Sequence, residues 1–152
     1  MTQKEYIANV LETLKIMEDS LRWLKRSYDK CQKIGVKKEY SDDEFDAFET
    51  LTSRYARTAD ILIYKVFRSI DAVEFENHGS LIDILNRAHK RGFFESIEKI
   101  RQIKELRNEI AHEYVKADIV ELYGDVIEFA PELFSICDNV KKYVEKNINS
   151  GE

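Results

Sequence analysis

The chain has 152 residues, enough for one domain with a substantial core but few for two. Its hydrophobic share of 43% and charged share of 35% are typical of amphipathic helices, while one proline and five glycines are too few for the turns of an all-β fold. With 24 basic and 29 acidic side chains the net charge is −5, which argues against indiscriminate coating of nucleic acid but permits a local basic pocket.

The cysteines and the first residues carry no export or membrane signal. Cys31 and Cys137 lack the spacing of metal ligands, so we expect free thiols in helix faces, as in a reducing cytosol. Residues 1–5 show no signal-peptide core, and the best apolar run, residues 59–64, is far too short to cross a bilayer. These observations predict a cytoplasmic, all-α protein with no membrane partner.

A long first helix is predicted from Tyr6 to near Gly35, which would close it as a left-handed cap. Trp23 lies off the apolar stripe of this helix and is either a partly buried ring or part of a surface for a partner. The stripe, spaced by threes and fours, consists of Val10, Leu14, Met17, Leu21, Leu24, Tyr28 and Cys31.

A second helix is predicted from the capping-box spacing of Ser41 and Glu44 to about Ile70. Ile61 and Ile63 widen its apolar surface, which indicates a helix at the centre of the fold or at a dimer interface. Most arginines on the other faces of such a helix are solvated or paired with acids, and a minority contact a ligand. These faces carry Arg54, Arg57 and Arg68.

A short third helix is expected after a loop at residues 73–79. Ser80 would cap it and Gly92 would close it. Its end, residues 87–91, is the most basic short run in the chain. These cations either complement the helix dipole, which the sequence favours, or contact RNA.

A fourth helix is predicted from Glu95 to about Ala111, with Ile97, Ile100, Ile103, Leu106 and Ile110 facing inward. Asp118, with Glu121 three residues later, predicts a new N-cap, so residues 115–117 would form a short connection.

The fifth helix would run from there to about Lys146. Pro131 cannot donate to the carbonyl of Ile127, so we expect a kink or break there. The predicted fold is therefore an all-α, single-domain, up-and-down bundle of about five helices over residues 1–147, followed by a frayed tail over residues 148–152.

The candidate functional residues lie toward the end of the fourth helix. On a helical wheel Arg107 lies at the border between the apolar and polar sides, about 140° from His112. Arg101 and Asn108 share the outward direction of His112, and Lys104 extends this polar side. We expect Arg107 and His112 to be catalytic and Asn108, Lys104 and Arg101 to bind the substrate.

The combination of a guanidinium and an imidazole suits RNA cleavage. Arginine offers a forked donor set for phosphate oxygens, and histidine can take and give a proton near neutral pH. Attack by the RNA's own 2′-hydroxyl needs no metal and leaves a 2′,3′-cyclic phosphate. A base and an acid are both required, and a two-fold dimer would bring a second His112 to the site. The non-catalytic alternative is that both side chains are surface groups that complement the helix dipole.

Metal and cofactor sites are not predicted. The three histidines are scattered, and the chain has no glycine-rich phosphate-binding loop between a strand and a helix. We therefore expect neither a metal nor a cofactor.

The spacing of Arg107, Asn108, His112 and Tyr114 resembles the signature of HEPN domains, and more narrowly that of HepT-type toxins of HEPN/MNT toxin–antitoxin pairs. The resemblance implies a homodimer whose two motifs face one cleft and cleave RNA without a metal. It implies that His112 transfers protons, Arg107 stabilises the phosphate, and Asn108 orients the substrate. It also implies that a cognate MNT nucleotidyltransferase antitoxin attaches AMP to Tyr114, which would repel RNA and block the cleft.

Two other functions remain open from the sequence. The first is a non-catalytic HEPN subunit that binds nucleotide or substrate for a partner nucleotidyltransferase. The second is a helical interaction module whose polar face is merely solvated.

Overall fold

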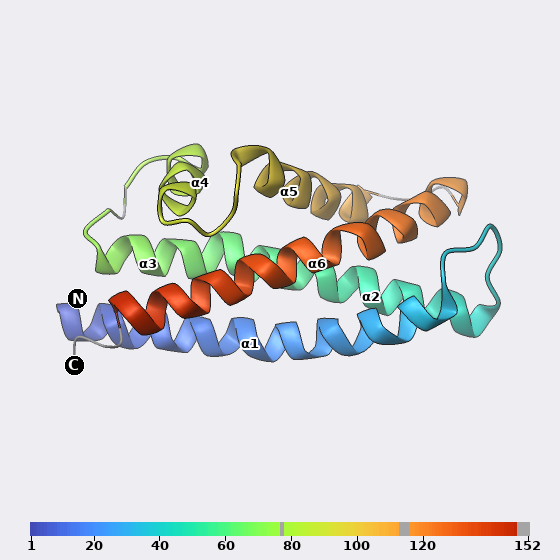
Figure 1. The fold of residues 1–152 in the computed structure, drawn as a ribbon, viewed down its shortest axis with the longest axis horizontal. Helices are drawn as coiled ribbons and strands as arrows, with labels where there is room; N and C mark the ends of the chain where they lie inside the picture. Colours follow the sequence, from blue (N-terminus) through green and yellow to red (C-terminus); the bar gives the residue numbers. More distant parts are fainter. Residues whose placement is uncertain (77, 113–115, 149–152) are drawn as a thin grey trace.

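The computed structural model describes residues 1–76, 78–112 and 116–148, with the backbone alone described at residues 116–118. Across these ranges the chain is helical and has no strand, so the predicted all-α class is confirmed. The elements are α1 (Gln3–Ile34), α2 (Asp42–Ile61), the π-helical turn η1 (Leu62–Val66), α3 (Phe67–Val73), α4 (Leu81–Lys90), α5 (Ile97–His112) and α6 (Lys116–Asn147) (Figure 1).

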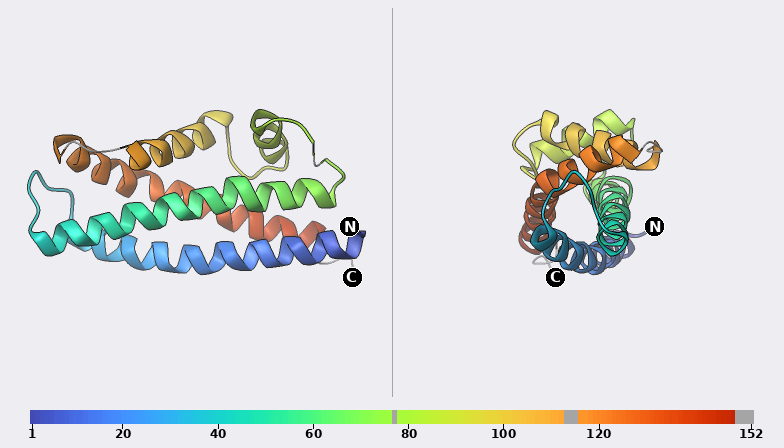
Figure 2. Two further views of the ribbon diagram at one scale, coloured as in Figure 1. Left: turned by 180° about the vertical axis from the view of Figure 1, so that it is seen from behind. Right: turned by 90° about the vertical axis from the view of Figure 1, so that its right-hand side faces the viewer.

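Four long rods give the molecule its elongated shape. The segments α2, η1 and α3 follow one another without interruption and form one rod, so the described chain contains five helical rods. The rods α1, α2–α3, α5 and α6 run alternately in opposite directions, whereas the short α4 lies across them (Figure 1). Seen along its length, the bundle has α1, α2–α3 and α6 around the core, with α4 and α5 on one side (Figure 2).

The buried residues show that the second rod lies at the centre of the fold. Ile61 and Ile63 are both buried inside the chain, so α2 and η1 are central to the monomer and do not need a dimer to cover these residues. Both cysteines are free and buried, and burial raises the pKa of Cys31 to about 11 and that of Cys137 to about 12. The thiols are therefore protonated at neutral pH and are poor nucleophiles.

The helix starts are formed by local side-chain hydrogen bonds. The predicted cap of the second rod is confirmed: the backbone N–H of Ser41 donates to Glu44 at 3.0 Å, and the N–H of Glu44 donates to Ser41 Oγ at 3.2 Å. The first helix begins earlier than Tyr6, because Thr2 and Glu5 make the same reciprocal pair. Helices α1 and α2 thus both begin at a capping box.

The π-helical turn was not predicted. An ordinary α-helix repeats every 3.6 residues, and a five-residue turn adds one residue to this repeat. The insertion lets Leu62, Ile63 and Val66 all face the core while Tyr64 and Lys65 remain exposed. The inserted residue explains why the apolar surface of the second helix is wider than a single stripe.

The helix that follows the motif differs from the prediction at its start and at its proline. It begins at Lys116, so the expected N-cap at Asp118 is wrong. It also continues through Pro131 without a break. Pro131 lies on the exposed side, where a long helix can absorb a lost hydrogen bond by curving, as α6 does (Figure 1).

The helix ends bring two smaller corrections. Gly35 follows α1 with φ 83° but ψ 163°, so it ends the helix in an extended and not a left-handed helical conformation. Ile148, expected in the frayed tail, is buried, and its N–H donates to the carbonyl of Val144 at 3.0 Å. The packed domain therefore reaches residue 148, and the remaining tail, 149–152, lies outside the described residues. Within those residues no helix combines the length and apolar character that a bilayer span requires.

Gly79 is expected to be more sensitive to substitution than Gly35. Both have a positive φ, which disfavours any side chain. A Cβ at Gly79 would also collide with the carboxylate oxygen of Asp83, which accepts from the N–H of Ser80 at 2.8 Å, whereas a Cβ at Gly35 would meet open space. In urea denaturation, Gly35→Ala should cost about 1–2 kcal/mol of unfolding free energy and Gly79→Ala at least about 1 kcal/mol more. Equal losses would show that the contact with Asp83 is relieved at no cost.

Candidate functional site

Helix α5 positions the motif by packing its apolar side onto α2. Ile100, Ile103 and Leu106 are buried, and the buried hydroxyl of Tyr55 on α2 donates to the carbonyl of Ile103 at 3.3 Å. The apolar spacing that predicted this helix is thus the spacing that fixes its rotation about its own axis. The directions of the motif's side chains on α5, those of Arg107, Asn108 and His112, are set by that rotation.

Arg107 forms a two-pronged ion pair with Asp60 of α2. Its Nε donates to Oδ1 at 2.7 Å and its Nη2 donates to Oδ2 at 2.9 Å, and the two side chains are 31% and 36% exposed. The hydrogen bond to Asp60 raises the pKa of Arg107 above its usual value. The guanidinium is therefore permanently charged and held in one orientation, with its Nη1 edge outside this pair.

His112 and its neighbours on the wheel face outward. His112 is the last residue of α5, and its side chain is exposed, as are those of Asn108 and Arg101. Lys104 is half-buried on the same side of the helix as Arg107. The structure brings Arg107 to Asp60 and leaves His112 about 140° away around the helix, so the two expected catalytic side chains point in different directions within one chain.

The remaining residue of the motif, Tyr114, lies outside the described residues. Its expected modification therefore stays a prediction.

Asp60 is the member of this site that sequence reasoning missed. It is 47 residues from Arg107 in the chain, so no local spacing connects them. One signal was available: Asp60 is the only charged residue in the run 59–64, which is otherwise apolar or aromatic. A carboxylate inside such a run needs a cationic partner when its helix is packed. Tyr64, four residues later and 42% exposed, is close enough to Arg107 to influence its charge.

The basic run at residues 87–91 has a role that neither sequence alternative described. Arg87 donates to Asp71 Oδ2 at 3.0 Å, and Arg91 donates to Asp71 Oδ1 and to Glu74 Oε1, both at 2.6 Å. The hydroxyl of Tyr143 on α6 also donates to Glu74, at 2.8 Å to Oε2. These two arginines therefore join α4 to α3 and are already paired with carboxylates.

Metal ligands do not cluster in the part of the chain that the structure describes. There, no group of three or more His, Cys, Asp or Glu side chains could hold a metal ion. At the described end of α5, the imidazole of His112 is suited to proton transfer and the guanidinium of Arg107 to phosphate binding.

Comparison of the chain with protein-family models, with curated proteins and with solved structures finds no match. The assignment of a function therefore rests on the residues of this chain and on their geometry.

Proposed function

We propose that this protein is a metal-independent endoribonuclease that acts as a homodimer, the toxin of a HEPN/MNT-type toxin–antitoxin pair. The observation that supports this most is the charge of Arg107 and the positions of Arg107 and His112 on α5. Arg107 is charged and held rigidly at the helix surface by Asp60, and His112 lies exposed five residues later at the end of the same helix. The setting agrees with the resemblance: an all-α bundle, with the motif late in the chain and one long helix after it.

The proposed reaction is a transesterification within the RNA. One His112 removes the proton from a ribose 2′-hydroxyl, and the 2′-oxygen attacks the adjacent phosphorus. The guanidinium of Arg107 stabilises the negative charge on the pentavalent phosphorus. A second imidazole gives a proton to the departing 5′-oxygen. The products are a 2′,3′-cyclic phosphate and a 5′-hydroxyl end.

The directions of the side chains support a dimer as part of this proposal. Arg107 faces α2 and His112 faces outward, so a single chain does not aim both at one phosphate. A two-fold axis next to the outward side of α5 would bring the His112 of each chain toward the Arg107 of the other. Asn108, Arg101 and Lys104 would then border the shared cleft and bind the RNA.

Silencing would act next to this cleft. In the proposed pair, an MNT nucleotidyltransferase antitoxin transfers AMP to the hydroxyl of Tyr114, two residues after His112 in the chain. The added phosphate carries negative charge, and the nucleotide adds bulk. Both would exclude RNA from a cleft lined by Arg107 and its neighbours.

The alternative of a non-catalytic subunit is supported by one observation, the pairing of Arg107 with Asp60. Two of the guanidinium's N–H donors, both on its Nε–Nη2 edge, are already used, and its charge is already balanced within the chain. Such a residue could hold a helix in place without touching a phosphate. In this case the protein would present a nucleotide or substrate to a partner nucleotidyltransferase and would not cleave RNA.

The test compares cleavable and non-cleavable RNA in the presence of EDTA. We expect the purified protein to cut a mixed-sequence RNA with 2′-hydroxyls and to leave ends that are 2′,3′-cyclic phosphates, as measured by mass spectrometry. The same sequence with 2′-O-methyl riboses should remain intact, because it lacks the attacking group. Cleavage of both RNAs, or loss of cleavage in EDTA, would contradict the proposed mechanism. No cleavage of either would favour the non-catalytic subunit.

A further inference from the structure

Trp23 is the centre of an arginine cluster on the outside of the bundle, which we call the Trp23 cluster: Trp23, Arg22 and Arg26 of α1 and Arg54 of α2. The indole is 39% exposed. The guanidinium carbons of Arg22, Arg54 and Arg26 lie 4.5, 5.1 and 5.9 Å from the centre of the ring. Three like charges are thus gathered around one aromatic side chain, which attracts each of them through its negative π-face.

The cluster is held in place by both helices. Arg54 donates through Nη1 to Ser27 Oγ at 2.7 Å and to the carbonyl of Trp23 at 3.2 Å. These bonds join α2 to α1 and fix one guanidinium beside the ring. The site is therefore largely organised before any ligand arrives, which lowers the cost of binding.

No carboxylate of the described residues balances the charges of the cluster. Among the described residues, no carboxylate lies within ion-pair distance of Arg22, Arg26 or Arg54. By contrast Arg107, Arg87 of α4 and Arg91 directly after α4 are each bound to a carboxylate. In a chain of net charge −5, three unneutralised guanidinium groups in one place indicate an anionic ligand from outside.

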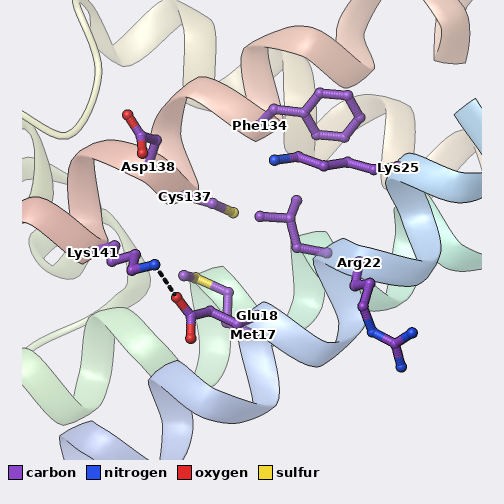
Figure 3. A pocket seen from close by; sticks show the side chains of 9 residues that line it. Met17, Glu18, Arg22, Lys25, Phe134, Cys137, Asp138 and Lys141 are labelled. Carbon is purple, nitrogen blue, oxygen red and sulfur yellow. Dashed lines mark ion pairs between the residues drawn. The ribbon is translucent and has the colours of Figure 1, made fainter. Parts of the chain in front are cut away.

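The hollow next to the cluster does not account for this arrangement. A cavity of about 300 Å³ lies between α1 and α6, with Met17, Phe134 and Cys137 among its lining. Glu18 and Lys141 form an ion pair across it, at 3.0 Å. Arg22 is at the rim, but its guanidinium points away from the hollow (Figure 3). The group that Arg22 offers is therefore directed to the outer surface.

The cluster lies on the same broad face as the candidate catalytic arginine. Arg54, Arg57 and Asp60 follow at intervals of three along α2, so each is about 60° further around the helix. The outer surface of α2 thus leads from Trp23 on α1, past the exposed Arg57, to the Arg107–Asp60 pair on α5. Helices α1, α2 and α5 lie side by side on this face (Figure 2).

We propose that the Trp23 cluster binds a single-stranded segment of the RNA substrate outside the catalytic cleft. The guanidinium groups bind phosphates, and an unpaired base stacks on the indole or on a guanidinium plane. This proposal rests on the proposed function for its choice of RNA as the ligand. An acidic protein segment is the less favoured ligand. Its carboxylates would need only the positive charges, so the exposed indole would have no role in binding it.

The experiment uses the chain's own fluorescence. Trp23 is the only tryptophan, so its emission reports directly on this cluster. The probe is a 12-nucleotide 2′-O-methyl uridine strand, which has no 2′-hydroxyl to react and is not expected to be cut. We expect saturable quenching, and a dissociation constant at least about ten-fold higher in Arg22→Gln/Arg26→Gln. For two lost phosphate contacts, the slope of log affinity against log salt should fall by about 1.4.

A matched control removes two cations elsewhere. Lys4→Gln/Lys142→Gln has the same net charge, and both lysines are exposed and outside the cluster. It should change the dissociation constant less than about two-fold. Circular dichroism and urea denaturation check that each double variant folds. A second binding measurement uses the anisotropy of a labelled strand. Trp23→Phe, which keeps an aromatic ring, should bind the strand more tightly than Trp23→Ala.

Three results would overturn the proposal: no quenching by the strand, equal weakening in the control variant, or equally tight binding of poly-glutamate of the same charge. The last would identify an acidic protein as the ligand. Cleavage is measured separately. Lost quenching with intact cleavage counts against the Trp23 cluster alone, and intact quenching without cleavage counts against the ribonuclease alone.

Discussion

Replacing His112 with alanine is expected to lower the rate of RNA cleavage by at least about 10²–10⁴-fold, the usual contribution of one general acid or base, because the proposed homodimer would lose both imidazoles. The side chain is exposed at the end of α5 and is not part of the core, so its loss should leave the fold and the dimer unchanged. Single-turnover cleavage of a labelled RNA measures the effect, and growth arrest on expression should disappear with it. His78→Ala is the matched control, because His78 is also exposed but precedes α5 in the sequence. The cleavage rate of this variant should equal that of the unsubstituted protein.

A subunit-mixing experiment tests whether the catalytic site is shared between chains. Homodimers of Arg107→Ala and of His112→Ala each lack one type of group altogether and should both be nearly inactive. A mixed dimer retains one arginine and one histidine on different chains, so it lacks the second imidazole and only partial recovery of the cleavage rate is expected. Activity of the mixture above that of either parent supports a composite site, and a mixture of verified mixed dimers that is no more active than either parent would contradict the pairing of Arg107 of one chain with His112 of the other.

Replacing Asp71 with asparagine is expected to lower the free energy of unfolding by about 3–5 kcal/mol, the range for removing one partner of a buried ion pair. The side chain of Asp71 is 1% exposed, and those of Arg87 and Arg91 are 14% and 9% exposed. Burial acts to lower the pKa of Arg91, but its hydrogen bonds to Asp71 and Glu74 outweigh this and raise it. Without the carboxylate of Asp71, Arg87 would lose the ion pair that balances its charge, and Arg91 would keep only its pair with Glu74.

Urea denaturation at a fixed protein concentration measures this loss, and the melting temperature should fall by on the order of 10 °C. The control is Asp138→Asn, the same chemical change in the exposed pair of Asp138 with Lys142. It should cost less than about 1 kcal/mol, because surface pairs contribute little. Similar values for the two variants would mean that solvent reaches the Asp71 network freely.

Much of the fold could be predicted because amphipathic helices repeat the same spacing over many turns. Of the stripe that begins at Val10, five residues are buried and the other two, Leu21 and Tyr28, are partly buried against the core, as their periodicity indicated. The π-helical turn was missed because it changes that spacing only once, and the apolar residues on both sides of it disguise the change. Of the kink or break expected at Pro131, the break is absent: α6 continues through the proline, which lies on the exposed side of the helix.

The candidate site was predictable only where it is local. The spacing of Arg107 and His112 is read along one helix, and so is their divergence of about 140°. The partners of the arginines come from other helices: Asp60 for Arg107, and Asp71 for the basic run at residues 87–91. Such pairs depend on how helices are rotated against one another, which periodicity leaves open. The grouping of Arg54 with Trp23 is of the same kind.

The order of the rods places the two ends of the folded domain together. Helix α1 begins and α6 finishes at one end of the bundle, while α5 finishes toward the opposite end (Figure 1). A fusion partner, affinity tag or further domain joined at either side of the domain would start its path remote from His112. Immobilising the protein through such an attachment should thus leave the surface at the end of α5 open to RNA and to a second copy of the chain.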